Sequence, residues 1–227
     1  GNAKGKSADD VPAAWERLTA KGGKLLVEVF VPFVRELAVM VVRGRDGVIK
    51  TYPVVETIQQ NHVCHVVYVP AVIPADIAAK AADIALHAVQ AIDGVGVFGV
   101  ELFELENGDV VYNEIAPRPH NSGHYTIEAC VTSQFENHIR AVMGWTLGST
   151  ELIKPAAVMV NILGTKQGDV PADAVAAALS VPDVHVHLYS KNQVRPGRKM
   201  GHVTIIGDDS PTKLEDLARQ AVDLIGL

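Results

Sequence analysis

The dipeptide Asn107-Gly108 predicts a tight chain reversal in the middle of residues 95–116. Both central residues of a type I′ turn need a positive φ angle, which asparagine and glycine adopt more readily than other residues. β-Branched and aromatic residues flank the dipeptide on both sides, as is typical of paired strands. The sequence therefore predicts an antiparallel hairpin over residues 95–116, with a register set by the turn.

This predicted turn brings two acids of the hairpin together. It sets three facing pairs on one face: Leu105 with Val110, Phe103 with Tyr112, and Glu101 with Glu114. Opposed carboxylates repel each other on a sheet, so the arrangement calls for a positive charge between them. Mg²⁺ suits such a pair, because it binds one or two carboxylates and leaves its other positions to water and phosphate oxygens. A shared proton, or two side chains that simply face water, are the alternatives.

Periodicity and turn residues predict the other elements of an α+β fold with mostly antiparallel strands. We expect helices at residues 8–20, 74–92, 126–143, 171–179 and 211–224. Further strands are expected at residues 24–30, 36–44, 48–55, 63–71, 156–163, 184–190 and 201–206. The polar link at 146–155 predicts a boundary between two domains, residues 1–148 and 149–227.

Composition argues against two classes of partner. The 227 residues carry a net charge of −6, and Lys and Arg are spread along the chain, so we expect neither a nucleic-acid nor a membrane surface. No apolar run approaches the length of a membrane span. Cys64 and Cys130 lie far apart and outside any metal-ligand spacing, which predicts buried thiols in a reducing compartment.

The stretch NEIAPRPHNSGH, residues 113–124, concentrates charged and hydrogen-bonding side chains in a segment interrupted by two prolines and a glycine. A rigid guanidinium such as that of Arg118 holds small planar anions well. His120 and His124 have the four-residue spacing of a zinc pair, but that spacing needs a helix. Because Gly123 intervenes, we expect a loop and no zinc. His124 is equally consistent with a ligand role and with a hydrogen bond at a helix start.

Several long motifs occur in an order that resembles one known family. They are FVPFVRELAVMVVRGRDG (30–47), YPVVETI (52–58), FGVELF (98–103), YNEIAPRPHNSGHYTIEACVTSQFENHIRAV (112–142) and VRPGRKMGHV (194–203). Together they resemble N5-carboxyaminoimidazole ribonucleotide synthetase, the ATP-grasp ATPase portion of phosphoribosylaminoimidazole carboxylase, in its fungal and plant forms. The resemblance implies a partial ATP-grasp fold, followed by a small α/β C-terminal domain that binds substrate.

The resemblance also implies a ligase activity of purine biosynthesis. ATP phosphorylates bicarbonate to carboxyphosphate, and this species, or CO2 released from it, is captured by the amino group of aminoimidazole ribonucleotide. The implied cofactors are ATP and Mg²⁺, and the partners are these small molecules. Full-length members are expected to be homodimers, cytoplasmic or, in plants and algae, plastidial.

Gly1-Asn2 match the end of the family's loop over the nucleotide phosphates, so the family's N-terminal domain is expected upstream. We therefore expect the isolated chain to have little or no ligase activity. A catalytically silent nucleotide-binding or dimerisation fragment and another ATP-grasp ligase remain the alternatives.

Site residues follow from the resemblance position by position. The implied ATP-binding residues are Glu28, Val29, Phe30, Val31, Glu36, Asn113 and Glu114. The implied metal ligands are Glu101 and Glu114, and the implied catalytic residues, which handle bicarbonate, are Arg118, His120 and Asn121. The implied substrate-binding residues are Ser122, Lys191, Arg195, Arg198 and Lys199. Gln59 stands where the family has a nucleotide-binding histidine, so we leave it out of the predicted site.

Overall fold

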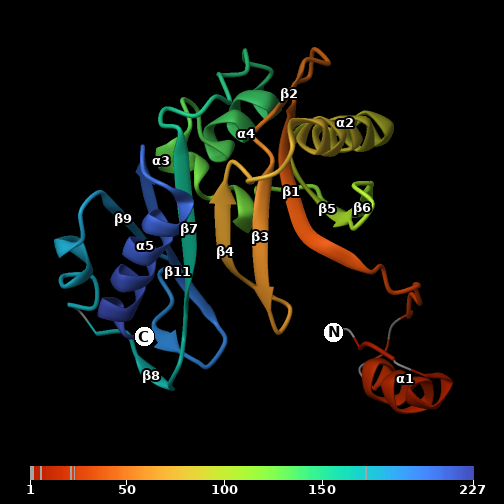
Figure 1. Cartoon of the computed structure of the whole chain (residues 1–227), viewed down its shortest axis with the longest axis horizontal. Coiled ribbons are helices and arrows are strands. Elements are labelled where there is room, and N and C mark those ends of the chain that lie inside the picture. Colours follow the sequence, from red (N-terminus) through yellow and green to blue (C-terminus); the bar gives the residue numbers. More distant parts are fainter. Residues whose placement is uncertain (1–2, 6, 21, 23, 172) are drawn as a thin grey trace. The chain divides into compact units, whose positions relative to one another are not determined.

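The computed structural model describes residues 3–5, 7–20, 22, 24–171 and 173–227, and the Gly1-Asn2 prediction lies outside them. The chain divides into two compact units, Gly1–Pro32 and Phe33–Leu227. Figure 1 shows their elements, and each unit is described by itself. No helix of the described residues is both long and apolar enough to cross a membrane.

The first unit contains the expected N-terminal helix. A short 3₁₀ turn, η1 (Ala8–Asp10), leads into α1 (Val11–Thr19), and the Ser7 backbone donates a 3.0 Å hydrogen bond to the Asp10 carboxylate. The strand predicted at 24–30 is wrong, because none of its described residues belongs to a strand. A strand needs a neighbour for its backbone groups, and the apolar side chains of Leu26 and Val29 are 81% and 90% exposed.

The second unit is built on a nine-stranded sheet in which every pairing between described strands is antiparallel. Its order is β6-β5-β1-β3-β4-β7-β11-β9, with β2 paired to β1. The strands are β1 (Phe33–Arg43), β2 (Ile49–Thr51), β3 (Val55–Gln60), β4 (Val63–Val69), β5 (Gly96–Leu105), β6 (Val110–Ala116), β7 (Ala156–Leu163), β9 (Val184–Leu188) and β11 (Lys199–Gly207). The β4–β7 pairing continues the sheet across the predicted domain boundary near residue 148. The division of the chain into domains 1–148 and 149–227 stays a prediction.

Helices cover the sheet through stripes of small and apolar side chains. The stripe of α2 (Ala75–Ile92) includes Ile77, Ala81, Ala85 and Val89, and packs in one cluster with β1 and β5. The stripe of α5 (Pro211–Ile225) includes Leu214, Ala218, Ala221 and Ile225, and packs with β7 and β11. Both helices agree with the predicted ranges, and Cys64 and Cys130 are free and buried as expected.

The helix predicted over residues 126–143 is two helices, α3 (Thr126–Ala129) and α4 (Gln134–Met143). Cys130 adopts an extended conformation and forms an isolated bridge with Leu152, which interrupts the helical hydrogen bonds. Ser133 then starts α4, because its side chain accepts a 3.1 Å hydrogen bond from the Glu136 backbone. The predicted end at Gly144 is confirmed by its left-handed φ of 72°.

The helix predicted at 171–179 is also wrong. Its described residues form successive turns that end in a 3₁₀ helix, η3 (Ala178–Ser180). Among the described residues of this segment, Ala174 and Ala178 are the buried ones, too few apolar anchors to offset the cost of starting an α-helix. Nearby, two short strands absent from the prediction, β8 (Gly168–Asp169) and β10 (Gln193–Val194), pair with each other.

The β5–β6 hairpin is confirmed, but its type I′ turn is wrong. The Leu105 backbone donates a 2.8 Å hydrogen bond to Asp109, so the loop has three residues in place of two. Gly108 has a φ of +78°, whereas Asn107 is not among the described residues with positive φ. The Asn107 side chain instead accepts a 3.0 Å hydrogen bond from the Asp109 backbone, an Asx turn that the prediction overlooked.

The longer loop shifts the hairpin register by one residue near the turn. Val110 lies opposite Glu104, and Tyr112 lies opposite Leu102. The predicted pairs of Val110 with Leu105 and of Tyr112 with Phe103, on one face with the two acids, are therefore wrong. A β-bulge on β6 then shifts the register back, because Asn113 is an extra residue between Tyr112, which lies opposite Leu102, and Glu114. Glu101 therefore lies opposite Glu114, as predicted, because two irregularities of the hairpin compensate for each other.

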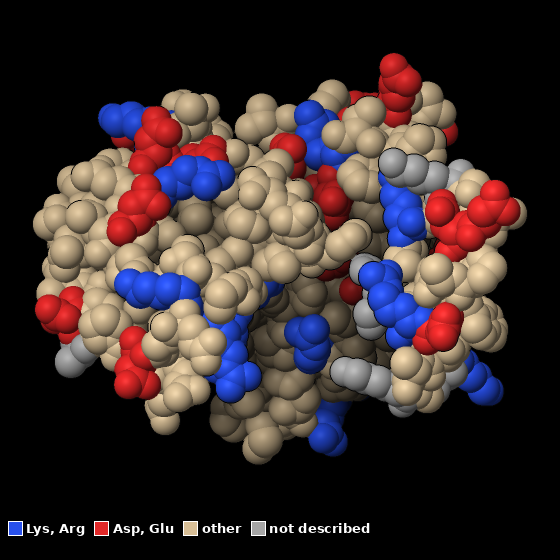
Figure 2. All heavy atoms as spheres, turned by 90° about the horizontal axis from the view of Figure 1, so that it is seen from below, with Lys and Arg blue, Asp and Glu red and all other residues tan. Residues whose placement is uncertain are grey.

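Positive and negative side chains are interspersed on the face of the molecule that Figure 2 shows. Within the second unit some opposite charges are paired, such as Arg140 with Glu136 along α4 and Lys213 with Asp209 at the start of α5. Exposed pairs of this kind contribute little stability each, so the fold depends mainly on its apolar clusters.

The hairpin loop generates a stability prediction. We expect Gly108→Ala to lower the free energy of unfolding by about 1 kcal/mol, because alanine is strained at positive φ. Gly168→Ala is the matched control, since no atom lies within 4 Å of the added methyl group and its φ is not positive. Urea denaturation of both variants checks this, and equal effects would contradict the described loop.

Candidate functional site

The two facing acids lie at the centre of the candidate site. Glu101 is half-buried on β5, and Glu114 is exposed on β6. Burial, followed by the charges of Glu114 and Glu36, raises the pKa of Glu101 to about 7, while Lys199 and Arg118 act in the opposite direction. A negative charge on Glu101 is thus unfavourable until a cation offsets it, and carboxylate oxygens are the donors that Mg²⁺ prefers.

A third acid extends this negative region on β1. Burial raises the pKa of Glu36, and a hydrogen bond from Gln59 on β3 partly opposes the shift. Gln59, which the sequence analysis left out, is therefore a direct neighbour of a predicted nucleotide-binding residue. Its uncharged amide bonds to the acid without supplying the charge that a histidine would.

His120 joins the loop after β6 to the acidic pair. Its Nε2 lies 3.5 Å from Oε1 of Glu101. Burial, then the charges of Arg118 and Lys199, lowers the pKa of His120 to about 4, so its imidazole is neutral at pH 7. The loop packs on the bare backbone of β5, because a Cβ at Gly99 would lie 2.5 Å from that of His120.

A buried amide that the sequence analysis did not identify fixes this loop. Gln134, the first residue of α4, is fully buried and bonds both backbone groups of His120, at 2.9 and 2.8 Å. Its Nε2 also lies 2.9 Å from Nδ1 of His124. That contact gives His124 a hydrogen-bonding role in the loop. A glutamine directly after a helix-capping serine, Ser133-Gln134, is the sequence signal that we missed.

Asn121 lies at the centre of a second polar network. Its Oδ1 accepts a 2.8 Å hydrogen bond from the Lys199 ammonium on β11. Asn161 on β7 exchanges two hydrogen bonds with it, at 2.8 and 3.0 Å, and Tyr189 lies 3.4 Å from its Nδ2. Asn161 and Tyr189 were not predicted. A lone amide inside the apolar strand 156–163 was the available signal, because a buried amide needs partners.

The structure thus brings together seven of the predicted residues: Glu36, Glu101, Glu114, Arg118, His120, Asn121 and Lys199. Asn113 directly precedes Glu114 in the middle of β6 and is exposed. The segment Glu28 to Val31 belongs to the other unit, so its relation to these residues is not described. Ser122 is 3% exposed, so its side chain does not face a ligand in this conformation.

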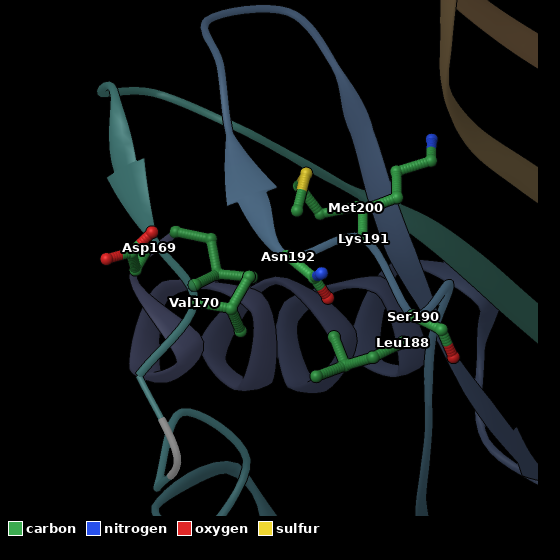
Figure 3. Close-up of a pocket in the computed structure, with 8 residues that line it drawn as sticks. Asp169, Val170, Leu188, Ser190, Lys191, Asn192 and Met200 are labelled. Carbon is green, nitrogen blue, oxygen red and sulfur yellow. The ribbon is translucent and has the colours of Figure 1, made fainter.

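The predicted substrate-binding cations separate into different environments. Lys191 lines a pocket of about 430 Å³, drawn in Figure 3, with Asp169, Val170, Leu188, Ser190, Asn192, Met200 and Leu227. The Asp169 carboxylate in this lining disfavours an anionic ligand there. Arg195 is exposed, and Arg198 donates a 3.1 Å hydrogen bond to the Gln193 carbonyl. Among these four described cations, Lys199 is the one that contacts the loop after β6, through its hydrogen bond to Asn121.

Comparisons with known proteins agree with this arrangement. The ATP-grasp domain model matches residues 1–135, and the phosphoribosylaminoimidazole carboxylase C-terminal domain model matches residues 157–216. A phosphoribosylaminoimidazole carboxylase of Schizosaccharomyces pombe is 49% identical, over 95% of this chain and 39% of its own length. An N5-carboxyaminoimidazole ribonucleotide synthase of Synechococcus elongatus is 48% identical, over 80% of this chain and 46% of its own length.

Among solved structures, an N5-carboxyaminoimidazole synthase of Aspergillus clavatus, in complex with ADP and 5-aminoimidazole ribonucleotide, matches with a TM-score of 0.86. It is 41% identical, and the match covers 100% of this chain and 60% of that one. The chain therefore spans less than half of these two curated relatives and about three fifths of this solved structure.

The raised pKa of Glu101 predicts a pH dependence of stability. The Glu101 carboxyl has a pKa of about 7 in the folded chain, against an ordinary value of 4.5. Its contribution to the free energy of unfolding is therefore largest at low pH and is lost as pH rises through 7. Glu101→Gln removes the group, so its free energy of unfolding relative to wild type should increase from pH 5 to pH 8, by at most about 3 kcal/mol. Urea denaturation at both pH values measures this difference.

Glu106→Gln is the control for this experiment, because Glu106 is exposed in the loop of the same hairpin. Its difference from wild type should stay constant with pH. A Glu101→Gln difference that is equally constant would show that Glu101 titrates normally.

Proposed function

The chain belongs to the ATP-grasp family, and from this we propose that it forms part of an ATP-dependent ligase that carboxylates 5-aminoimidazole ribonucleotide during purine biosynthesis. The observation that carries the proposal is the facing pair Glu101–Glu114, with the His120–Asn121 loop beside it. The names of the similar proteins support the substrate, since one solved relative is described with ADP and 5-aminoimidazole ribonucleotide.

In this proposal Glu101 and Glu114 hold the magnesium ion of a bound nucleotide. When bound, the ion would offset the charge of the phosphate oxygens during phosphoryl transfer. The donor set fits, because both side chains offer carboxylate oxygens, and because burial together with the charges of Glu114 and Glu36 raises the pKa of Glu101. Glu36 and Asn113 are proposed to contact the nucleotide.

The loop after β6 is proposed to bind bicarbonate. Arg118 is exposed and carries a planar fork of donors that matches the oxygens of a small anion. The neutral imidazole of His120 can donate or accept one hydrogen bond without adding a charge. Asn121 is held by Lys199 and Asn161, so its amide is already oriented before a ligand arrives.

Enclosure of this loop serves the proposed chemistry. Carboxyphosphate is consumed by water, so the residues around it must exclude solvent until the amine of the substrate reacts. His120 and Asn121 are both partly buried, and Gln134 binds the His120 backbone.

We propose that Lys199, together with Arg198, Arg195 and Lys191, binds the phosphate group of the ribonucleotide. Ser122 is proposed to contact the substrate through its backbone.

The metal assignment predicts that Mg²⁺-dependent binding of ADP weakens at least about tenfold in Glu101→Gln and in Glu114→Gln. Each change keeps the shape of the side chain and removes its charge. Isothermal titration calorimetry of the full-length protein measures the affinity with and without Mg²⁺. Glu106→Gln should bind like wild type, and an unchanged affinity in both site variants would refute the assignment.

The reaction assignment predicts that release of phosphate from ATP by the full-length protein requires both bicarbonate and 5-aminoimidazole ribonucleotide. Arg118→Lys should lower kcat/KM for bicarbonate on the order of 10- to 100-fold, because an ammonium cannot form two parallel hydrogen bonds. Arg219→Lys, in an exposed ion pair on α5, is the control. Phosphate release that needs a different acceptor would indicate another ATP-grasp ligase.

A further inference from the structure

A second group of metal-binding side chains lies away from the Glu101–Glu114 pair. His187 on β9 and His202 on β11 are directly opposite in the register of the two strands, and Glu128 comes from α3. One ligand atom from each of the three lies within 4.8 Å of the other two. Two imidazoles and one carboxylate form a donor set that zinc uses in proteins.

Two atoms of this group are buried without a hydrogen-bond partner among the described residues: Nε2 of His202 and Oε2 of Glu128. His202 is only 1% exposed. A buried polar atom without a partner is costly, and most such atoms in folded proteins find one. Because both unpaired atoms belong to one cluster, a single shared ligand would satisfy them together.

The surroundings of His202 resemble those of a metal-binding histidine. Its Nδ1 lies 2.9 Å from the Tyr189 hydroxyl, which holds the ring and leaves Nε2 for a ligand. Histidines that bind metals commonly have their second nitrogen held in this way. Tyr189 in turn lies 3.4 Å from the side-chain amide of Asn121.

His187 and Glu128 must adjust for an ion to bind. Nε2 of His187 lies 2.6 Å from Oε1 of Glu128, so a proton occupies the space between them. The rings of His187 and His202 are nearly parallel, at 14°, whereas a metal lies close to the plane of each ring it binds. The side chain of His187 is 36% exposed, which leaves it room to turn towards a shared ion.

We propose that Glu128, His187 and His202 bind a divalent transition metal of the zinc type, with water as a fourth ligand. Nitrogen donors select such ions over Mg²⁺, which prefers oxygen donors, so this site differs in kind from the Glu101–Glu114 pair. A bound ion would link α3 to β9 and β11 and, through Tyr189, restrict Asn121. The inference does not depend on the proposed function.

The test is a titration of the chelator-treated 227-residue chain with Co²⁺ and with Zn²⁺. We expect one ion per chain, with the visible absorption of four-coordinate Co²⁺ that Zn²⁺ then displaces. Glu128→Gln and His187→Gln should each weaken Zn²⁺ binding by at least roughly 100-fold, since loss of an outer-shell partner alone costs about 10- to 100-fold. His202→Gln should act likewise, and His187→Gln, on the partly exposed side, is the variant least disruptive to folding.

Two controls separate this site from other binding. His87→Gln removes an exposed histidine of α2 and should leave Zn²⁺ affinity unchanged. Glu101→Gln should also leave it unchanged, so failure of the Mg²⁺ assignment and failure of this proposal are distinguishable. Absence of stoichiometric binding, or binding that survives both Glu128→Gln and His187→Gln, would overturn the proposal.

Discussion

The repulsion between Glu101 and Glu114 is the interaction on which the candidate site depends. Burial is the main cause that disfavours a negative charge on Glu101, and the hairpin adds to it by holding the Glu114 carboxyl group opposite. Protonation relieves this repulsion at low pH, and a bound cation would relieve it at neutral pH. The neighbouring loop is organised around the same pair, because His120 approaches Glu101 over the bare backbone at Gly99.

Two buried amides keep the loop in place without adding charge. Gln134 binds the backbone of His120 on both sides, and Asn161 pairs with the side chain of Asn121. Neither amide touches the acidic pair in the described contacts. Gln134 fixes the position of His120, which approaches Glu101, and Asn161 fixes that of Asn121. Fully paired buried amides are well suited to this, because any other arrangement leaves them without partners.

The sequence predicted the fold class, the hairpin and most of the sheet, because apolar periodicity and turn residues are local signals. It failed where a partner far along the chain decides the structure. Cys130 leaves the helical conformation to bridge Leu152, and the apolar residues at 24–30 find no strand to pair with. The pairing of Glu101 with Glu114 was predicted from the wrong turn, since neither the Asx turn at Asn107 nor the bulge at Asn113 on β6 was foreseen.

The candidate site shows the same contrast between local sequence signals and contacts with residues far along the chain. Residues within the loop motif were identified because they lie close together in the sequence. Asn161 on β7 and Tyr189, which directly follows β9, are brought near Asn121 only by the tertiary fold. Gln59 was set aside because it departs from the family pattern, yet it bonds to Glu36. Departure from a motif changes the chemistry of a position without removing the residue from the site.

The pKa of the Glu101 carboxyl group, followed by ¹³C NMR of the labelled side chain, tests the carboxylate pair most directly. In the chain alone we expect a value of about 7, and a lower value when Mg²⁺ is added at saturation. Glu114→Gln should also lower it, because the negative charge that raises the pKa of Glu101 most is removed. A Glu101 carboxyl that titrates in the ordinary range for glutamate, unaffected by Mg²⁺ or by Glu114→Gln, would contradict the proposed cation site.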